Sequence, residues 1–351
     1  MNNGLLQDIS ASSQTKSDYG RRDFLSKSMM ALAGGFSTAE AMLTEIGEAR
    51  AQDPRQPTLS TANVVASFFP GFRQTQIETS GAIINVLTGG SGAPLLLMHG
   101  YPQTLVEWHR IAPQLAQRFS VVLTDLRGYG DSSKPPDGEN HFGYSKRAMA
   151  LDQVEVMERL GFRQFAVVGH DRGGRVGHRM AIDHRDRITK LAVLDIVPTL
   201  RMYQTTDKVF ATTYFHWFFL IQPAPFPETL INCNIEAWLR LKNVPFIAPE
   251  AYSEYLRCFR DPATLHASCE DYRAAASIDL EHDAADLDRK VECPLLVLWG
   301  EKGFMPHYDV IAAWQERAMN VRGKALPGGH WLPEQLPAET LAELIPFLSE
   351  A

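Results

Sequence analysis

An aspartate between glycines is the first feature of this 351-residue sequence that could do chemistry. In residues 167–174, an apolar run leads into Gly-His-Asp-Arg-Gly-Gly, with Asp171 in the third position, and a helix-like pattern follows. Glycines at these positions let a chain turn sharply from a strand into a helix and expose the central side chain. A carboxylate there can displace a leaving group from saturated carbon and form an ester that water must cleave. The alternative is an aspartate that only caps the helix.

Cleavage of such an ester needs a base, and the base needs a group that orients it. His330 follows a Leu-Pro-Gly-Gly loop after the last strand-like run, so it is the predicted general base. Two carboxylates could orient it: Asp195, directly after the apolar run 191–194, and Glu301, after the run 295–299. We favour Asp195, because its run is the next one after that of Asp171 and an apolar Ile-Val-Pro segment follows it. Glu301 stays open as the alternative.

Groups that could stabilise negative charge flank the nucleophile. Tyr101 lies in a His-Gly-Tyr-Pro segment after a strand-like run, and its N–H and that of Arg172 are expected to form an oxyanion hole for the second oxygen of Asp171. Arg172 and Arg175 are three residues apart at a helix start, so they share a face and add to the helix dipole. Two buried guanidinium groups are costly without an anion, which predicts a bound substrate carboxylate. Pairing with acidic residues of the protein is the alternative.

The segments that must position these residues alternate between strand-like and helix-like patterns. Residues 72–77 and 82–87 have the pattern of a hairpin, and short apolar, β-branched runs follow at 94–98, 120–124, 165–168, 189–194, 294–299 and 321–325. Helix-like patterns lie between them at 105–117, 145–160, 173–184 and 308–318. This alternation predicts an α/β fold with a mostly parallel, doubly wound sheet, preceded by a hairpin that turns at residues 80–81.

The strand rhythm stops from residue 199 to about 288, where aromatic, helix-like sequence is punctuated by prolines. We therefore expect a helical cap domain at 199–288, inserted into a core domain made of 52–198 and 289–351.

The first fifty residues differ from the rest: Arg21 and Arg22 precede a short apolar segment, and Ala-Arg-Ala ends at Ala51. This pattern predicts a twin-arginine signal peptide over residues 1–51, and hence the export machinery as a partner and a periplasmic location. A leader without that function would leave the protein in the cytoplasm.

Composition excludes several other classes of protein. The chain has 34 Lys and Arg against 41 Asp and Glu, a net charge of −7, so nucleic acid is not an expected partner. No run of about 18 apolar residues exists that could span a membrane. Four scattered cysteines show neither metal-binding nor disulfide spacing, and nucleotide-binding and zinc motifs are absent. We therefore predict no metal and no cofactor.

Together these motifs resemble the α/β-hydrolase superfamily over the whole mature chain, and the segment 169–175 looks closest to the fluoroacetate dehalogenases. The resemblance implies hydrolysis of a haloacetate to a 2-hydroxy acid and halide through an ester on Asp171. It also implies a halide site made of His216 and Trp217, from an aromatic run, and Tyr272, from an Asp-Tyr-Arg-Ala segment. Members are commonly homodimers. The stretch 227–252 is shorter than is usual in that family, so the preferred halogen and chain length stay open.

Two alternatives use the same residues differently. An epoxide hydrolase would keep Asp171 and His330 but needs cap tyrosines to protonate the epoxide oxygen. The candidates for that role are Tyr203, Tyr214, Tyr252 and Tyr255. A small-molecule receptor without catalytic activity is the second alternative, and turnover of any substrate would exclude it.

Overall fold

The computed structural model describes residues 61–240 and 244–350. The predicted leader, residues 1–51 with Arg21, Arg22 and the cleavage site after Ala51, lies outside the described residues. Its export function therefore stays a prediction. Among the described residues, no helix is long and apolar enough to cross a membrane.

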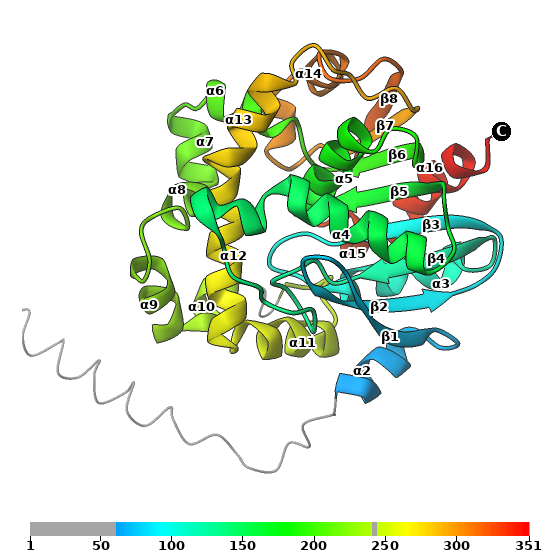
Figure 1. The fold of residues 1–351 in the computed structure, drawn as a ribbon, viewed down its shortest axis with the longest axis horizontal. Coiled ribbons are helices and arrows are strands. Elements are labelled where there is room, and N and C mark those ends of the chain that lie inside the picture. The colour runs from blue at the N-terminus through cyan, green and yellow to red at the C-terminus, as the bar shows by residue number, and fades with distance from the viewer. Residues whose placement is uncertain (1–60, 241–243, 351) are drawn as a thin grey trace, which may run out of the picture. The chain divides into compact units, whose positions relative to one another are not determined.

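An eight-stranded sheet forms the centre of the described chain (Figure 1). Its strand order is β1-β2-β4-β3-β5-β6-β7-β8, in which β1, β2 and β4 pair antiparallel and the strands from β4 through β3 to β8 pair parallel. The strands are β1 (Arg73–Glu78), β2 (Ile83–Gly89), β3 (Ala93–Met98), β4 (Phe119–Thr124), β5 (Phe165–His170), β6 (Ile188–Leu194), β7 (Leu295–Gly300) and β8 (Val321–Leu326). All eight predicted strands are present, and the predicted fold class is confirmed.

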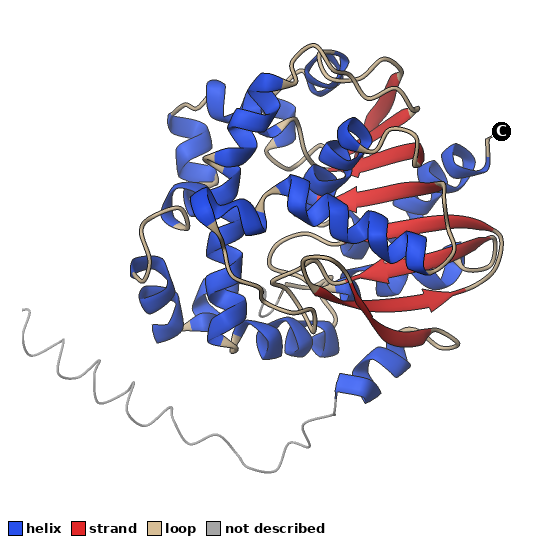
Figure 2. Ribbon diagram, in the orientation of Figure 1, coloured by secondary structure: helices blue, strands red, loops and turns tan. Residues whose placement is uncertain are grey.

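The central strands are apolar because helices cover both faces of the sheet, as Figure 2 shows. Leu95, Leu96 and Leu97 of β3 are fully buried, as are Val167 and Val168 of β5. The antiparallel edge strand β1 is mostly exposed and polar. Because the strands from β4 through β3 to β8 are parallel, their carboxyl ends lie along the same edge of the sheet, where ligands bind in folds of this kind.

The helices that pack around the sheet follow the predicted pattern with one exception. They are α2 (Thr61–Phe68), η1 (Leu105–Arg110), α3 (Ala112–Leu115), η2 (Glu139–Tyr144), α4 (Lys146–Arg159), α5 (Asp171–Asp183), η3 (Met305–His307), α14 (Val310–Gln315), α15 (Leu332–Gln335) and α16 (Pro337–Ser349). The single helix predicted over 105–117 was wrong. The structure has the 3-10 helix η1 and a short α3, because Pro113 starts a new helix instead of continuing the first.

Between β6 and β7, the described residues form helices and loops without any strand. The helices are α6 (Thr199–Gln204), α7 (Lys208–Thr213), α8 (Phe215–Phe219), α9 (Phe226–Cys233), α10 (Ile235–Leu239), α11 (Pro249–Phe259), α12 (Pro262–Ala275) and α13 (Ile278–Ala285). They gather beside one end of the sheet (Figure 1). We call this segment the helical insertion. The division into core and cap domains at residues 198 and 288 stays a prediction.

Candidate active site

Asp171 is the first residue of α5, at the sharp turn that follows β5. Its φ is +42°, a left-handed conformation that a residue with a side chain adopts only under constraint. The turn depends on its flanking glycines. A Cβ on Gly169 would lie 2.4 Å from the carbonyl oxygen of Gly173, and a Cβ on Gly173 would lie 2.3 Å from the carbonyl oxygen of Met98. The chain can approach itself this closely only without side chains, which is the geometry of a nucleophile elbow.

The loop after β3 contacts the carboxylate of Asp171. The N–H of Tyr101 donates to Asp171 Oδ2 at 3.1 Å, and the N–H of Gly173 donates to the carbonyl of His99 at 2.9 Å. Within the described chain, the N–H of Arg172 makes no hydrogen bond to Asp171. Of the two donors expected for the oxyanion hole, the structure therefore brings Tyr101 to the carboxylate and does not bring Arg172.

His330 is paired with Asp195. The Nδ1 atom of His330 lies 2.6 Å from Asp195 Oδ2, and the N–H of Gly300 donates to Asp195 Oδ1 at 2.8 Å. Asp195 is 1% exposed and follows β6 with a φ of +53°. Glu301, the other carboxylate considered, is exposed. The bond at Nδ1 leaves Nε2 of His330 as the nitrogen that can accept a proton.

Arg172 and Arg175 are both buried next to the nucleophile, but they have different partners. Arg172 Nε and Nη2 bind the Asp271 carboxylate at 2.9 and 2.6 Å. Arg175 Nη1 donates to the Thr199 hydroxyl at 2.8 Å and to a backbone carbonyl, and within the described chain it has no carboxylate in an ion pair. The alternative of pairing with an acidic residue of the protein therefore holds for Arg172 and not for Arg175.

Within the described residues, each of these guanidinium groups keeps one nitrogen without a hydrogen-bond partner. Arg172 Nη1 and Arg175 Nε are buried, and neither has a hydrogen-bond acceptor in the described part of the chain. A buried N–H group without an acceptor costs free energy, and a bound anion would recover it. Burial alone would raise the pKa of Asp171, but the electrostatic influence of His330 and of the two arginines holds that pKa below its ordinary value. Asp171 is therefore ionised at neutral pH.

A cavity of about 500 Å³ opens in front of Asp171. His330, His216 and Tyr272 also line it, so the structure brings these predicted residues together. Trp217 and the two arginines are not among the lining residues. Trp217 is 1% exposed, and the guanidinium carbon of Arg175 lies 4.7 Å from its ring centroid. These three residues are thus close to the cavity but behind its wall.

Two polar side chains in the cavity wall, His216 and Tyr272, are uncharged at neutral pH and can donate hydrogen bonds. Burial lowers the pKa of His216 to about 4, so its imidazole is neutral and one ring nitrogen carries a hydrogen. Burial and the charge of Asp171 raise the pKa of Tyr272 well above its ordinary value. Both side chains are therefore neutral hydrogen-bond donors beside the nucleophile.

Some residues of the cavity were not predicted. Trp238, on α10, lines it and donates from Nε1 to the hydroxyl of Tyr101 at 2.6 Å. No local pattern in the sequence marks this tryptophan, because its partner lies 137 residues away.

Two of the tyrosines considered for an epoxide hydrolase lie in different places. Tyr214 lines the cavity, whereas the hydroxyl of Tyr255 binds Glu334 at 3.0 Å outside it.

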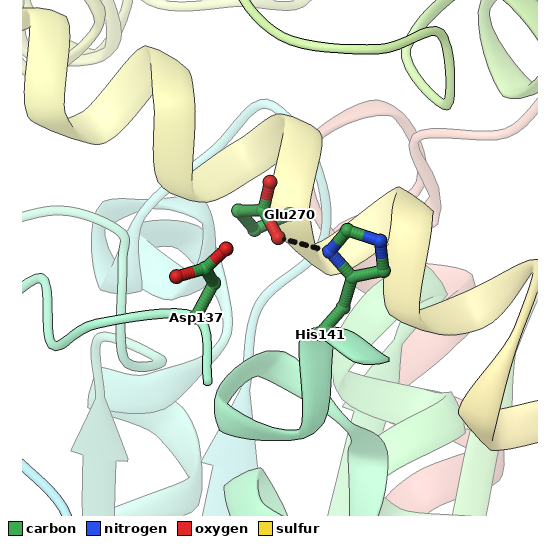
Figure 3. A group of neighbouring side chains, drawn as sticks. All are labelled: Asp137, His141 and Glu270. Carbon is green, nitrogen blue, oxygen red and sulfur yellow. Dashed lines mark hydrogen bonds and ion pairs between the residues drawn. The ribbon is translucent and has the colours of Figure 1, made fainter. Parts of the chain in front are cut away.

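Figure 3 shows a second group of polar side chains, Asp137, His141 and Glu270. These residues are not among those that line the cavity. Their ligand atoms are within 4.8 Å of one another, so they could hold a metal ion. However, Glu270 Oε2 pairs with His141 Nδ1 at 2.5 Å, and Oε1 pairs with Arg273 Nη1 at 2.6 Å. These contacts already satisfy Glu270 and connect η2 to α12.

Comparison with known proteins agrees with this geometry. Residues 93–335 match the family model of the α/β hydrolase fold. The chain belongs to the α/β hydrolase family. Among relatives, a fluoroacetate dehalogenase of a Burkholderia species is 46% identical over 81% of this chain and 96% of its own length. A soluble epoxide hydrolase of a Corynebacterium species is 34% identical over 78% of this chain and 96% of its own length.

Solved structures of α/β hydrolases resemble this one closely. A protein of Nostoc sp. PCC 7120 assigned to the α/β hydrolases is 59% identical and superposes with a TM-score of 0.78. The match covers 80% of this chain and 99% of that chain. The sequence motifs around Asp171 indicated a resemblance to the α/β-hydrolase superfamily and, within it, to the fluoroacetate dehalogenases. These comparisons confirm that resemblance.

The elbow geometry predicts different effects for two glycines of the same helix. Gly173→Ala should lower the free energy of unfolding by about 1–3 kcal/mol, because its Cβ would meet backbone atoms that cannot move. Gly177→Ala should change it by less than about 1 kcal/mol, because the nearest atoms to its Cβ are side-chain ends, at 3.0 Å and beyond. Urea denaturation measures both. Equal effects would contradict the assignment of the constraint to Gly173.

Proposed function

We propose that this α/β hydrolase cleaves the carbon–halogen bond of haloacetates by hydrolysis and releases a 2-hydroxy acid and halide. The observation that carries the proposal is a buried, ionised aspartate at the elbow, next to two buried arginines that each keep a free nitrogen. A carboxylate nucleophile suits displacement at saturated carbon, and the free nitrogens suit a substrate that is itself an anion. The 46% identity to a fluoroacetate dehalogenase supports the same activity.

The charges around the site indicate where the substrate carboxylate binds. Asp271 balances the charge of Arg172, whereas Asp171 is the acidic group with the largest influence on Arg175. When Asp171 becomes an ester, its negative charge is lost, and a substrate carboxylate near Arg175 would keep that guanidinium compensated. In the proposal, Arg175 Nε and Arg172 Nη1, which lie behind the cavity wall in the free protein, hold the substrate carboxylate once a small shift of the wall exposes them.

In the first step, Asp171 attacks C2 of the haloacetate from the side opposite the halogen. Because Oδ2 accepts from Tyr101, Oδ1 is the attacking atom. The new C2–O bond takes the place of the carbon–halogen bond, whose electron pair leaves with the halide. His216 and Tyr272 donate to the leaving halide from the cavity wall, and the proposal places Trp217 with them after a small shift of the wall.

In the second step, Nε2 of His330 takes a proton from water, and the hydroxide attacks the carbonyl carbon of the Asp171 ester. Tyr101 N–H stabilises the oxyanion that forms, and Asp195 stabilises the positive charge on His330. The bond between the Asp171 carbonyl carbon and Oδ1 breaks, and His330 returns the proton to the departing 2-hydroxy acid. The restored Asp171 carboxyl then loses its proton to solvent.

Epoxide hydrolysis is the second candidate, because Tyr214 and Tyr272 both line the cavity and an epoxide hydrolase is a 34% identical relative. Both candidates share Asp171 and His330. Only hydrolysis of a haloacetate gives a role to Arg172 Nη1 and Arg175 Nε, because an epoxide has no carboxylate for them to bind.

Halide release by the purified full chain tests the proposal. Fluoroacetate and chloroacetate should release halide, and Asp171→Asn should abolish this release. Arg175→Lys should raise KM, because lysine keeps the charge but loses the planar fork. His330→Ala should stop after the first step, so mass spectrometry should find Asp171 carrying the substrate's carboxymethyl group. Formation of a diol from an epoxide without any halide release would refute the proposal in favour of the second candidate.

The pairing of His330 predicts which carboxylate supports it. Asp195→Asn should lower kcat by about 10³-fold or more, because the imidazole loses the charge that stabilises its protonated form. Glu301→Gln, the matched control, should leave kcat within about twofold, because Glu301 is exposed and solvent screens its charge. A larger loss in Glu301→Gln than in Asp195→Asn would contradict the assigned role.

We further propose that the chain is exported by the twin-arginine pathway and acts in the periplasm as a homodimer. The support for export is the pair Arg21 and Arg22 ahead of a short apolar segment and Ala51. Replacement of both arginines by lysine should retain the precursor in the cytoplasm, and the exported form of the natural chain should begin at Gln52. Cell fractionation with N-terminal sequencing measures this, and unchanged export of the lysine variant would contradict it.

A further inference from the structure

Two fully buried ionisable residues, Glu107 and His170, join the segments that carry the proposed catalytic groups. Glu107, on η1, accepts from the N–H of Gly100 at 2.9 Å through Oε2. Its Oε1 lies 3.0 Å from Nδ1 of His170, the residue directly before Asp171. One carboxylate thus holds both the loop of Tyr101 and the end of β5.

His170 in turn contacts the segment that carries the proposed base. Its Nε2 lies 2.9 Å from the carbonyl oxygen of His330, and the two rings are 4.7 Å apart. Both ring nitrogens of His170 therefore lie within 3.0 Å of an oxygen atom, and the contact of Nδ1 with Glu107 is an ion pair whose alignment is not that of a hydrogen bond. A neutral imidazole carries a hydrogen on one nitrogen alone, so a carboxylate at Nδ1 and a carbonyl oxygen at Nε2 together favour the doubly protonated, cationic ring.

We propose that Glu107 is a positioning residue that keeps His170 cationic, and that the His170 cation fixes the main chain of His330 and promotes cleavage of the Asp171 ester. The kinetic part of this inference rests on the proposed function. The charge state of His170 does not rest on it, because it follows from the contacts of the buried ring.

The charge of Asp171 changes in opposite directions in the two chemical steps. The attack on C2 removes the negative charge of its carboxylate, whereas the attack of hydroxide on the ester creates negative charge on the same group. A fixed cation on the preceding residue opposes the first change and favours the second. Loss of this cation should therefore slow ester cleavage more than ester formation.

The charged and titratable groups around His170 support a cation. Burial alone would lower the pKa of His170, but Glu107, with smaller effects of Asp171 and Asp195, raises it to about 9. The ring of His330 lies beside that of His170, and Glu334 influences His170 through electrostatics without contacting it in the described chain. A pKa raised in this way means that the cation persists below about pH 9 and is lost above it.

Glu334, on α15, provides a matched control. Burial and the charge of Glu107 raise the pKa of Glu334 to about 8, so at pH 7 this carboxyl is mostly neutral. It accepts hydrogen bonds from Tyr255 at 3.0 Å and Gln103 at 2.5 Å, and it contacts neither His170 nor Gly100 in the described chain. Glu334→Gln thus changes a buried carboxyl in the same region without removing a charge at pH 7.

The charge state can be measured in the full-length, wild-type protein without any substrate. Nitrogen NMR of labelled histidine, with His170 assigned by comparison with His170→Asn, should show both ring nitrogens protonated at pH 7 and deprotonation near pH 9. In Glu107→Gln, the midpoint should fall by more than one pH unit. A neutral His170 ring in the wild type at pH 7 would overturn the inference, and this measurement stands even if the variant of Glu107 does not fold.

Single-turnover kinetics with chloroacetate test the positioning role. Glu107→Gln should slow cleavage of the ester roughly 10- to 100-fold and its formation far less, so the alkylated enzyme should accumulate. Glu107→Asp should recover part of the rate, and Glu334→Gln should match the wild type at pH 7. In the wild type, the rate of ester cleavage should fall above about pH 9, and this fall should move to lower pH in Glu107→Gln.

The outcomes separate the two proposals. Equal slowing of both steps, or the same loss in Glu334→Gln as in Glu107→Gln, would reduce Glu107 to a structural role and refute the inference. A cationic His170 that depends on Glu107, in a protein that releases no halide from any haloacetate, would refute the proposed function and support the charge assignment.

Discussion

The turn at Asp171 is the constraint on which the rest of the site depends. The backbone changes from a buried strand to a helix within one residue, and this fits only because the neighbouring carbonyl groups meet glycines. The same turn places the carboxylate against the N–H of Tyr101, and Arg172 in the first turn of α5 binds Asp271 of the helical insertion. The energy stored in the left-handed conformation must be supplied by the packing of the sheet on both sides of β5.

Buried charge is the second organising feature, and each ion is compensated differently. Arg172 is neutralised by Asp271, which also binds Lys146 and the hydroxyl of Tyr129. Arg175 has hydroxyl and carbonyl partners but no carboxylate in contact within the described chain. Such an incomplete arrangement costs stability in the free protein, and an anionic ligand would repay that cost on binding.

The sequence predicted the features that local patterns encode. Apolar, β-branched runs located the six strands from β3 to β8, a hairpin pattern located β1 and β2, and the glycines around Asp171 located the elbow. Topology then favoured Asp195 over Glu301, and the structure places Asp195 on His330. Long-range partners could not be predicted this way: nothing local shows that Asp271 would bind Arg172, and Glu107 looks like one acidic residue on an otherwise apolar helix face. The prediction of a single helix over 105–117 was wrong because it followed the amphipathic pattern and did not treat Pro113 as the start of a new helix.

The helix α12 has successive residues with three separate partners. Glu270 pairs with His141 near the surface, Asp271 holds Arg172, and Tyr272 reaches the cavity. A substitution along this helix would therefore disturb several contacts at once. Phe215, Leu239 and Val244 line the same cavity from other parts of the helical insertion and have apolar side chains. Changes in substrate preference during evolution, or by directed evolution, are thus least costly at these apolar positions, while α12 remains the part of the cavity wall that tolerates the fewest changes.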